Sequence, residues 1–406
     1  MDLDVVVVGA GQAGVAVSYE LASAGIEHVV LERGLVAQSW RDRWDSFCLV
    51  TPNATIGLPG ARYQGDDPDG FLRKDELVGH FEGWVSSFAA PVRERVAVTS
   101  LEIVDGRGFR LLTSDGALAA RSVVICTGAY QRPHRSSVLP PGHVAELDAD
   151  DYRSEGALPP GKVLVVGSGQ TGCQIAEELN VAGREVVLSC GRAPWAPRRP
   201  GGRDIILWLI DAGFYDQPVA DLPGPAARLV ANVQATGRDG GHDLNLRVLR
   251  EAGVTLAGRL LGAEDGRLHF ASDLGDSAAF GDARYAELRR VILDYCAHAD
   301  VDPPELPDPP RFDRAAPQRL DLDDFGVILH TSGFRPDYRA WVHVDAFDEM
   351  GFPIQRDGAS LTTPGLYFCG VHFLRKRKSS LLMGVGEDAA IVAEAIAQQK
   401  SHGRHG

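Results

Sequence analysis

Two glycine-rich turns constrain the fold of this 406-residue chain more than any other feature. The first reads Gly-Ala-Gly-Gln-Ala-Gly over residues 9–14, the second reads Gly-Ser-Gly-Gln-Thr-Gly over residues 167–172, and each follows an apolar run. A predicted helix and a second apolar strand, residues 28–32 or 185–189, come after each turn. In such a unit one glycine makes the tight turn, one lets the backbone approach a pyrophosphate, and one packs the helix against the strand. A single copy is a weak signal, but two complete units 158 positions apart predict an α/β fold with two dinucleotide-binding, Rossmann-like domains.

The two turns supply the first predicted cofactor-binding residues. A helix that begins directly after a glycine turn directs free backbone N–H groups and a favourable dipole at an anion. In the two turns we assign to cofactor binding Gly9, Gly11, Gln12, Ala13, Gly14, Gly167, Gly169, Gln170, Thr171 and Gly172.

The two units differ at the end of their second strands. Glu32 lies 18 positions after the last glycine of the first turn, close to the ~20 expected for a carboxylate that accepts from a ribose 2′-hydroxyl. The corresponding position of the second unit is Cys190, and Arg192 follows it. A missing carboxylate with a nearby guanidinium suits the 2′-phosphate of NADP, so we assign FAD to the first site and NADPH to the second. A solvated basic loop is the alternative for the arginines. The predicted binding residues of these strand ends are Glu32, Arg33, Arg192 and Arg198.

Charge and cysteine usage exclude several classes of protein. The formal net charge is −14 with 44% hydrophobic residues, which argues against nucleic acid as the main partner because phosphate binding needs clustered Lys and Arg. The six cysteines are scattered without a CxxC pair, so neither a thioredoxin-type redox pair nor a paired-cysteine zinc site is expected, and no metal site is predicted. No targeting or membrane segment is visible, so we expect a cytoplasmic protein without a membrane partner.

Beyond the two turns, several short motifs carry a resemblance to a known family. They are the Trp-Arg-Asp-Arg-Trp run at 40–44, Thr-Pro-Asn at 51–53, Gly-Arg-Asp at 202–204, the segment 364–370, and the linkers Cys-Thr-Gly at 126–128 and Thr-Ser-Gly-Phe at 331–334. Over nearly its whole length the chain resembles the class B flavin-dependent monooxygenases, in the bacterial branch of NAD(P)/FAD-dependent oxidoreductases. The resemblance implies a discontinuous FAD domain, residues 1–153 and 331–406, with an NADPH domain, residues 154–330, inserted into it.

The resemblance also implies roles for individual residues. Thr51 and Asn53 match a polar segment beside the flavin and are the predicted catalytic residues, because an amide there can hydrogen-bond the flavin or its peroxide. An Asn after Pro is also a common turn residue, and aromatic residues at this spacing are often only core. The further cofactor contacts implied are Trp40, Arg41, Trp44, Thr127, Gly128, Ser332, Gly333 and Gly370.

The reaction implied by the resemblance is reduction of FAD by NADPH, followed by transfer of one oxygen atom from O2 to a small organic substrate through a flavin C4a-hydroperoxide. The predicted partners are that substrate and O2, and a homodimer is left open. One position departs from the family: Asp148 stands where relatives commonly carry a histidine, although Tyr152 at the end of the same motif is kept. This keeps open an NADPH oxidase or dehydrogenase that does not oxygenate its substrate. The basic run 375–378 is expected to be a solvated loop, or else to screen cofactor phosphates or receive an anionic substrate.

Overall fold

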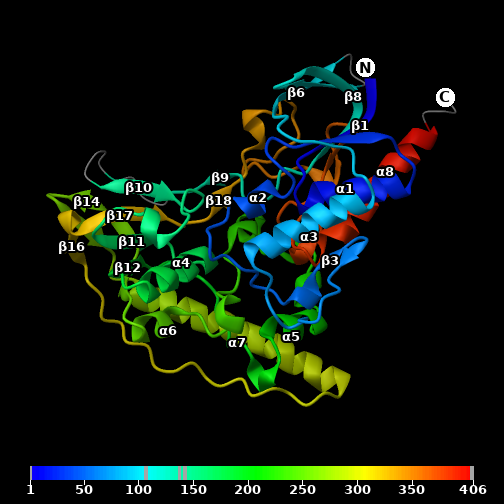
Figure 1. Cartoon of the computed structure of the whole chain (residues 1–406). Coiled ribbons are helices and arrows are strands. Elements are labelled where there is room, and N and C mark those ends of the chain that lie inside the picture. The colour runs from blue at the N-terminus through cyan, green and yellow to red at the C-terminus, as the bar shows by residue number, and fades with distance from the viewer. Residues whose placement is uncertain (1, 105–107, 136–138, 140–143, 403–406) are drawn as a thin grey trace.

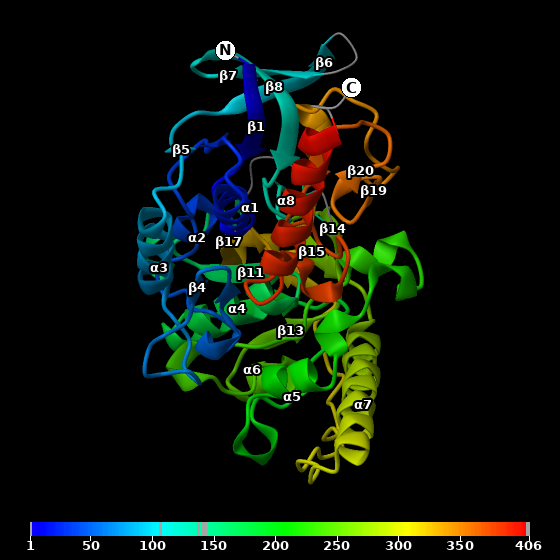
Figure 2. The same ribbon diagram turned by 90° about the vertical axis from the view of Figure 1, so that its right-hand side faces the viewer.

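The chain folds around two large β-sheets, the first mixed and the second parallel. The computed structural model describes residues 2–104, 108–135, 139 and 144–402. The blue start and the red end of the chain lie together in one part of the molecule, and the green and yellow middle of the chain forms the other part (Figures 1 and 2). The predicted α/β class is thereby confirmed, with one sheet made from both ends of the chain and one sheet made from its middle.

The first sheet has nine strands and joins segments from the two ends of the sequence. Its central strand β1 pairs in parallel with β2 and β8, and β8 also pairs in parallel with β21, which comes more than 240 residues later. Its strands, in spatial order, are β19 (Gln355–Arg356), β20 (Ala359–Ser360), β21 (Leu366–Phe368), β8 (Gly116–Ile125), β1 (Asp2–Val8), β2 (His28–Leu31) and β5 (Val92–Arg93), with β7 (Gly108–Thr113) and β6 (Val98–Val104) extending from β8.

The second sheet has five strands, all parallel. In spatial order they are β10 (Ala145–Asp148), β17 (Phe325–His330), β11 (Lys162–Val166), β12 (Val186–Ser189) and β13 (Thr255–Ala257). Three small antiparallel sheets accompany it: β14 (Leu260–Glu264), β15 (Arg267–Phe270) and β16 (Arg319–Asp321); β9 (Arg132–Pro133) and β18 (Phe334–Arg335); and β3 (Gly57–Leu58) and β4 (Ala61–Arg62). β10 joins this sheet although it precedes residue 154, where the sequence predicts the inserted domain to begin.

Helices cover the sheets. They are α1 (Gln12–Ser23), α2 (Gln38–Arg41), α3 (Lys74–Ser87), α4 (Gln170–Val181), α5 (Ile205–Asp211), α6 (Leu246–Glu251), α7 (Leu274–Ala299) and α8 (Val385–His402). α1 and α8 pack against each other on the first sheet, where their apolar side chains share one core with β1 (Figure 2). The sequence predicts a helix over residues 278–299, and the structure has one that starts four residues earlier. It also predicts a last helix over 386–397, which in the structure extends to His402. The Pro- and Asp-rich residues 300–310 are expected to form a loop, and they lack regular secondary structure.

The central strand of each sheet is buried on both faces. In β1, Val5 and Val7 point into the core shared with α1 and α8, whereas Val6 and Val8 point into a second core beneath β7 and β8. β11 divides its side chains between two cores in the same way. Parallel strands covered on both sides have this continuous apolar sequence, which explains the unbroken apolar runs before the two turns.

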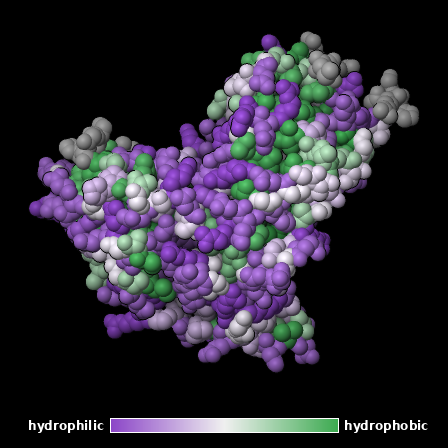
Figure 3. All heavy atoms as spheres, in the orientation of Figure 1, coloured by the Kyte–Doolittle hydropathy of each residue, from purple (hydrophilic) through white to green (hydrophobic). Residues whose placement is uncertain are grey.

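The outer surface is predominantly hydrophilic on the face shown in Figure 3, in keeping with a charged fraction of 24%. Among the helices of the described residues, none is both long and apolar enough to cross a membrane.

Candidate functional site

The first glycine turn lies at the carboxyl edge of the first sheet, between β1 and α1. Gly9 has a φ of +103°, and a Cβ there would lie 2.6 Å from the carbonyl oxygen of Cys126. A Cβ at Gly14 would lie 1.8 Å from the oxygen of Gly9, so helix and strand can pack this closely only through glycine. At Gly11, by contrast, no atom of the described chain lies within 4 Å of a Cβ position. The turn therefore leaves open space at the glycine that a pyrophosphate would approach.

The second turn repeats this design between β11 and α4. Gly167 has a φ of +113°, a Cβ at Gly172 would lie 1.9 Å from the oxygen of Gly167, and the nearest atom to a Cβ at Gly169 is 3.9 Å away. Gly11 and Gly169 are the N-caps of α1 and α4, and neither helix start has a side-chain cap within the described chain. Both helices thus direct unfilled backbone N–H groups into open space, and both turns fit a bound dinucleotide.

Glu32 organises the first turn. Its carboxylate accepts hydrogen bonds from the backbone N–H of Ala10 at 2.7 Å and of Gly34 at 2.9 Å, and the residue is 7% exposed. These bonds join the end of β2 to the glycine turn and fix the carboxylate at the edge of the site. The neighbouring Arg33 is exposed to solvent.

Two of the three residues predicted from the 40–44 motif, Arg41 and Trp44, contact parts of the protein other than the first glycine turn. Arg41 donates to the carbonyl oxygen of Val36 at 2.9 Å and forms an ion pair with Glu82 of α3 at 2.5 Å. Trp44 is 4% exposed and packs edge-on against Phe47, in the core of the second sheet. Both therefore position the loop after α2 between the two sheets.

Trp40 contacts the first turn directly. Its indole N–H donates to the side-chain oxygen of Gln12 at 3.0 Å, and the Gln12 amide donates to the carbonyl oxygen of Ser380 at 2.7 Å. Gln12, at the first position of α1, thereby connects the glycine turn to the C-terminal segment of the chain.

The predicted catalytic residues follow in a buried loop. The side-chain N–H of Asn53 donates to the carbonyl oxygen of Asp67 at 2.9 Å, and its side-chain oxygen accepts from the N–H of Leu72 at 2.7 Å. Asn53 is 2% exposed, so its amide supports the 67–72 loop from inside. Thr51 is half-buried two residues earlier.

Both linkers lie beside the turns, as the resemblance implies. Thr127 and Gly128 accept hydrogen bonds from the side chain of Gln131 at 3.2 and 3.0 Å. The hydroxyl of Ser332 donates to the carbonyl oxygen of Val166, at the end of β11. Gly128, Gly333 and Gly370 all adopt positive φ, and a Cβ at Gly370 would lie 2.6 Å from the Cβ of Ala13. The chain needs glycine there because β21 ends directly against the start of α1.

The two arginines predicted for the 2′-phosphate are in different surroundings. Arg192 is exposed, with its guanidinium 5.8 Å from the ring centroid of Phe280. Arg198 is 2% exposed, lies 2.8 Å from the Asp204 carboxylate and stacks over Phe71 at 4.6 Å. Burial lowers the pKa of Arg198 and raises that of Asp204. Arg192 is therefore the more accessible of the two to a phosphate in solution.

Asp148, at the position where relatives commonly carry a histidine, is held by Arg135. The guanidinium binds its two carboxylate oxygens at 2.9 and 3.1 Å. Nearby, the hydroxyl of the fully buried Tyr152 donates to Glu178 at 2.7 Å. The two ends of this motif thus take part in separate polar contacts.

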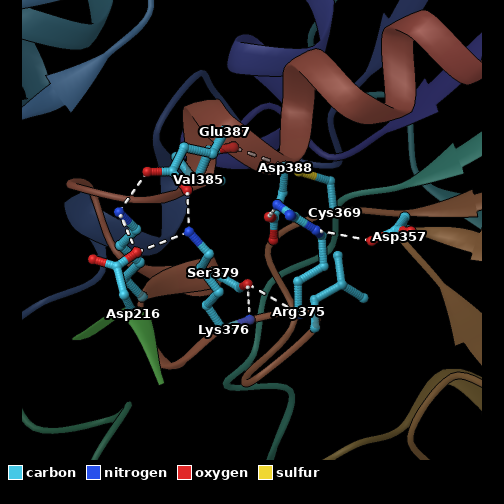
Figure 4. Close-up of polar contacts among 12 residues, drawn as sticks. Asp216, Asp357, Cys369, Arg375, Lys376, Ser379, Val385, Glu387 and Asp388 are labelled. Atoms are coloured by element: carbon cyan, nitrogen blue, oxygen red, sulfur yellow. Dashed lines mark hydrogen bonds and ion pairs between the residues drawn. The ribbon is translucent and has the colours of Figure 1, made fainter. Parts of the chain in front are cut away.

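The basic run at 375–378 is neither a solvated loop nor an open anion site. Lys376 and Lys378 both pair with Asp216 of the chain's middle part, at 2.8 and 3.0 Å, and both pair with Glu387 of α8 (Figure 4). Arg375 pairs with Asp357 at 3.1 Å and with the buried Asp388 at 2.9 Å. We call residues 375–378 with Asp216 the basic clasp, because these ion pairs join the C-terminal part of the chain to its middle part.

Sequence reasoning missed Tyr130 and His372. Each lies two residues after a glycine that ends a strand of the first sheet, Gly128 after β8 and Gly370 after β21. Since β8 and β21 are paired in parallel, the two side chains meet, with ring centroids 5.0 Å apart. In both places a glycine after the strand is followed two residues later by a residue with a ring side chain, and this repeated spacing is the signal that could have identified them.

These features define an α/β protein with two open dinucleotide turns at the carboxyl ends of parallel strands in the two large sheets. Residues 6–206 match the family described as pyridine nucleotide-disulphide oxidoreductase. Among curated proteins, "Uncharacterized oxidoreductase CzcO-like" of Geobacillus kaustophilus is 28% identical over 403 residues, covering 97% of this chain and 98% of its own length. "Indole-3-pyruvate monooxygenase YUCCA4" of rice is 32% identical over 196 residues, covering 43% of this chain and 44% of its own.

Solved structures show the same fold. A flavin-containing monooxygenase from Stenotrophomonas maltophilia superposes with a TM-score of 0.66 at 18% identity, covering 98% of this chain and 99% of its own. The chain is an oxidoreductase, and its resemblance to the class B flavin-dependent monooxygenases is confirmed. The expected cofactors, FAD and NADPH, agree with these relatives.

Proposed function

We propose that this protein is an NADPH-dependent flavin monooxygenase acting on a small organic molecule. The observation that carries the proposal is the pair of open glycine turns, one at the carboxyl end of a parallel strand in each of the two large sheets. An enzyme that passes a hydride between two nucleotides needs this arrangement. The names of the rice and Stenotrophomonas relatives support the oxygenase class.

FAD is assigned to the first turn and NADPH to the second. At the first turn, the buried Glu32 carboxylate suits a ribose hydroxyl and would repel a 2′-phosphate. At the second turn, the corresponding residue is Cys190, which carries no charge, and the exposed Arg192 follows. We accordingly assign residues 1–153 and 331–406 to the FAD domain and 154–330 to the NADPH domain, with β10 of the first segment added to the sheet of the NADPH domain.

When both nucleotides are bound, NADPH supplies the hydride and the flavin supplies activation of O2 at its C4a position, the hydroperoxide route that the resemblance implies. The protein's own contribution is to hold the nucleotides and to exclude water from them. Gly11 and Gly169 leave room for the phosphates, while the α1 and α4 termini present N–H groups to them. Trp44 packs in the core of the second sheet, and the buried Asn53 amide holds the 67–72 loop.

The test is the coupling of NADPH consumption to oxygen transfer. Purified holoenzyme is screened with small amines, sulfides and ketones, and NADPH oxidation, hydrogen peroxide and product are measured together under isotope-labelled O2. We expect at least one class of substrate to stimulate NADPH oxidation, lower the peroxide yield and gain one labelled oxygen atom. Labelled product absent throughout, with peroxide stoichiometric to NADPH for every class, would overturn the proposal.

A second candidate, an NADPH oxidase or dehydrogenase on the same scaffold, is favoured by one observation. The position at which relatives commonly carry a histidine holds Asp148, and both its oxygens are bound by Arg135. If the histidine is needed to couple NADPH to oxygenation, this chain lacks that device. The stoichiometric peroxide described above is the result that this candidate predicts.

A further inference from the structure

His372 and Tyr130 form a pair of rings at the carboxyl edge of the first sheet. His372 follows Gly370 at the end of β21, and Tyr130 follows Gly128 at the end of the neighbouring β8. The two rings meet edge to face at a centroid distance of 5.0 Å. In open parallel sheets, ligands bind in the crevice outside the carboxyl ends of the strands, which is where this pair lies.

The imidazole of His372 is fixed in orientation by a hydrogen-bonded chain that begins at the first glycine turn. Its Nδ1 lies 3.0 Å from the hydroxyl oxygen of Ser380. The carbonyl oxygen of the same serine accepts from the Gln12 side chain, and Gln12 in turn accepts from the indole of Trp40. One ring nitrogen is held by Ser380, and no hydrogen bond joins the other, Nε2, to the part of the chain that the structure describes, so Nε2 is left for a ligand.

The backbone beside His372 is unusual. Phe373 has a φ of +49°, in the left-handed region that a bulky side chain rarely adopts. Such strained residues persist where the surrounding structure determines them, and they cluster at ligand sites. Here the turn at Phe373 connects β21 to the 3₁₀ segment Arg377–Ser380. The last residue of that segment, Ser380, lies beside the imidazole of His372.

His372 is half-buried and lies against an aromatic ring. Burial lowers the pKa of its imidazole to about 4. The neighbouring ring of Tyr130 is 47% exposed and also contacts Phe334 of the second linker at 5.2 Å and the guanidinium of Arg43 at 5.6 Å. The imidazole is thus neutral at ordinary pH, and it adds a hydrogen-bonding group without adding a charge.

We propose that His372 is a cofactor-binding residue that hydrogen-bonds the isoalloxazine ring of the flavin through Nε2. The inference rests on the proposed function. The flavin is favoured over the nicotinamide because the contacts that fix His372 run to the first glycine turn: Ser380 is bound to Gln12, and Gly370 packs on Ala13. The second linker, by contrast, contacts the ring of Tyr130 through Phe334, and Tyr130 in turn contacts His372.

The test compares H372A and H372Q with wild type and with H343Q, a substitution of an exposed histidine away from the ring pair. Glutamine can place an amide near the position of Nε2, whereas alanine cannot. Four properties are measured on each purified protein: thermal midpoint, FAD dissociation constant, visible absorbance spectrum of the bound flavin, and its midpoint potential. None of these requires turnover, and an unchanged thermal midpoint shows that the variant folds.

We expect H372A to shift the flavin absorbance bands and the midpoint potential and to weaken FAD binding by roughly two- to tenfold, the effect of one neutral hydrogen bond. H372Q should recover most of this change, and H343Q should match wild type. Flavin spectra, potentials and affinities that are the same in H372A and wild type would refute the inference. A wild-type protein that binds no FAD would instead refute the proposed function, so the two failures are distinguishable.

Discussion

The basic clasp gives a prediction whose size follows from the structure. In Asp216→Asn, one carboxylate that pairs with both Lys376 and Lys378, at 2.8 and 3.0 Å, is replaced by a neutral side chain of the same size. Asp216 is 48% exposed and the lysines are 30% and 15% exposed, so each pair is worth at most about 1 kcal/mol. Both lysines keep Glu387 as a partner, which limits the loss further. We therefore expect a total cost of about 1 kcal/mol.

The assay is thermal unfolding of wild type, D216N and D302N at low salt and in 1 M NaCl, followed by tryptophan fluorescence. Asp302 is exposed in the loop after α7 and forms no ion pair among the described residues, so D302N controls for the lost charge. D216N should unfold earlier than both other proteins at low salt, and most of the difference should vanish in 1 M NaCl, where the screening length is about 3 Å. A difference of the same size at both salt concentrations would refute the electrostatic account of the clasp.

The pH dependence of the same difference has a defined sign. The hydrogen bond from Lys376 is the largest cause that lowers the pKa of Asp216 below its ordinary value. A depressed carboxyl pKa contributes stability above the unfolded value of about 3.9, and this contribution is lost as the pH falls through the folded value. Wild type and D216N should therefore differ at pH 7 and converge below about pH 4.

Three further predictions concern the nucleotide sites. Arg192→Ala should raise the Michaelis constant for NADPH far more than that for NADH, because it removes a partner of the 2′-phosphate; equal effects in steady-state kinetics would count against that contact. Gly11→Ala should fold with an unchanged circular dichroism spectrum but bind less FAD, since its Cβ meets no described atom, whereas Gly14→Ala should fail to fold because its Cβ would meet the Gly9 oxygen at 1.8 Å. Asn53→Ala should lower the free energy of unfolding by about 1–3 kcal/mol in urea titrations, because it removes the partner of the Leu72 N–H and of the Asp67 carbonyl oxygen; an unchanged stability would contradict the structural role of the amide.

The parts of the fold that depend on local sequence could be predicted. The glycine turns, their flanking strands and the strand Phe325–His330 follow from patterns that a few neighbouring residues impose. The space left at Gly11 and Gly169 agrees with the role that their position in the turn predicts. The resemblance implied that both ends of the chain form one domain, but the pairing of β8 with β21 was not predicted, since no local pattern joins strands so far apart.

The contacts that depend on tertiary structure could not be predicted. Arg198 looks like a phosphate ligand in the sequence, but a buried carboxylate six residues later pairs with it. The basic run looks exposed because its acidic partners come from distant segments, Asp216 among them. His372 gave no signal by itself, because its importance lies in the meeting of two strand ends and in its bond to Ser380.

The central claim, that this chain uses NADPH and a flavin to activate oxygen, is tested most directly by stopped-flow spectroscopy. The holoenzyme is reduced with NADPH without oxygen and is then mixed with oxygenated buffer while the flavin spectrum is recorded. The account predicts rapid reduction by NADPH, followed by an absorbance band of oxygenated flavin before the oxidised spectrum returns. Direct return of the oxidised spectrum with no such band, and with one equivalent of hydrogen peroxide released, would contradict it.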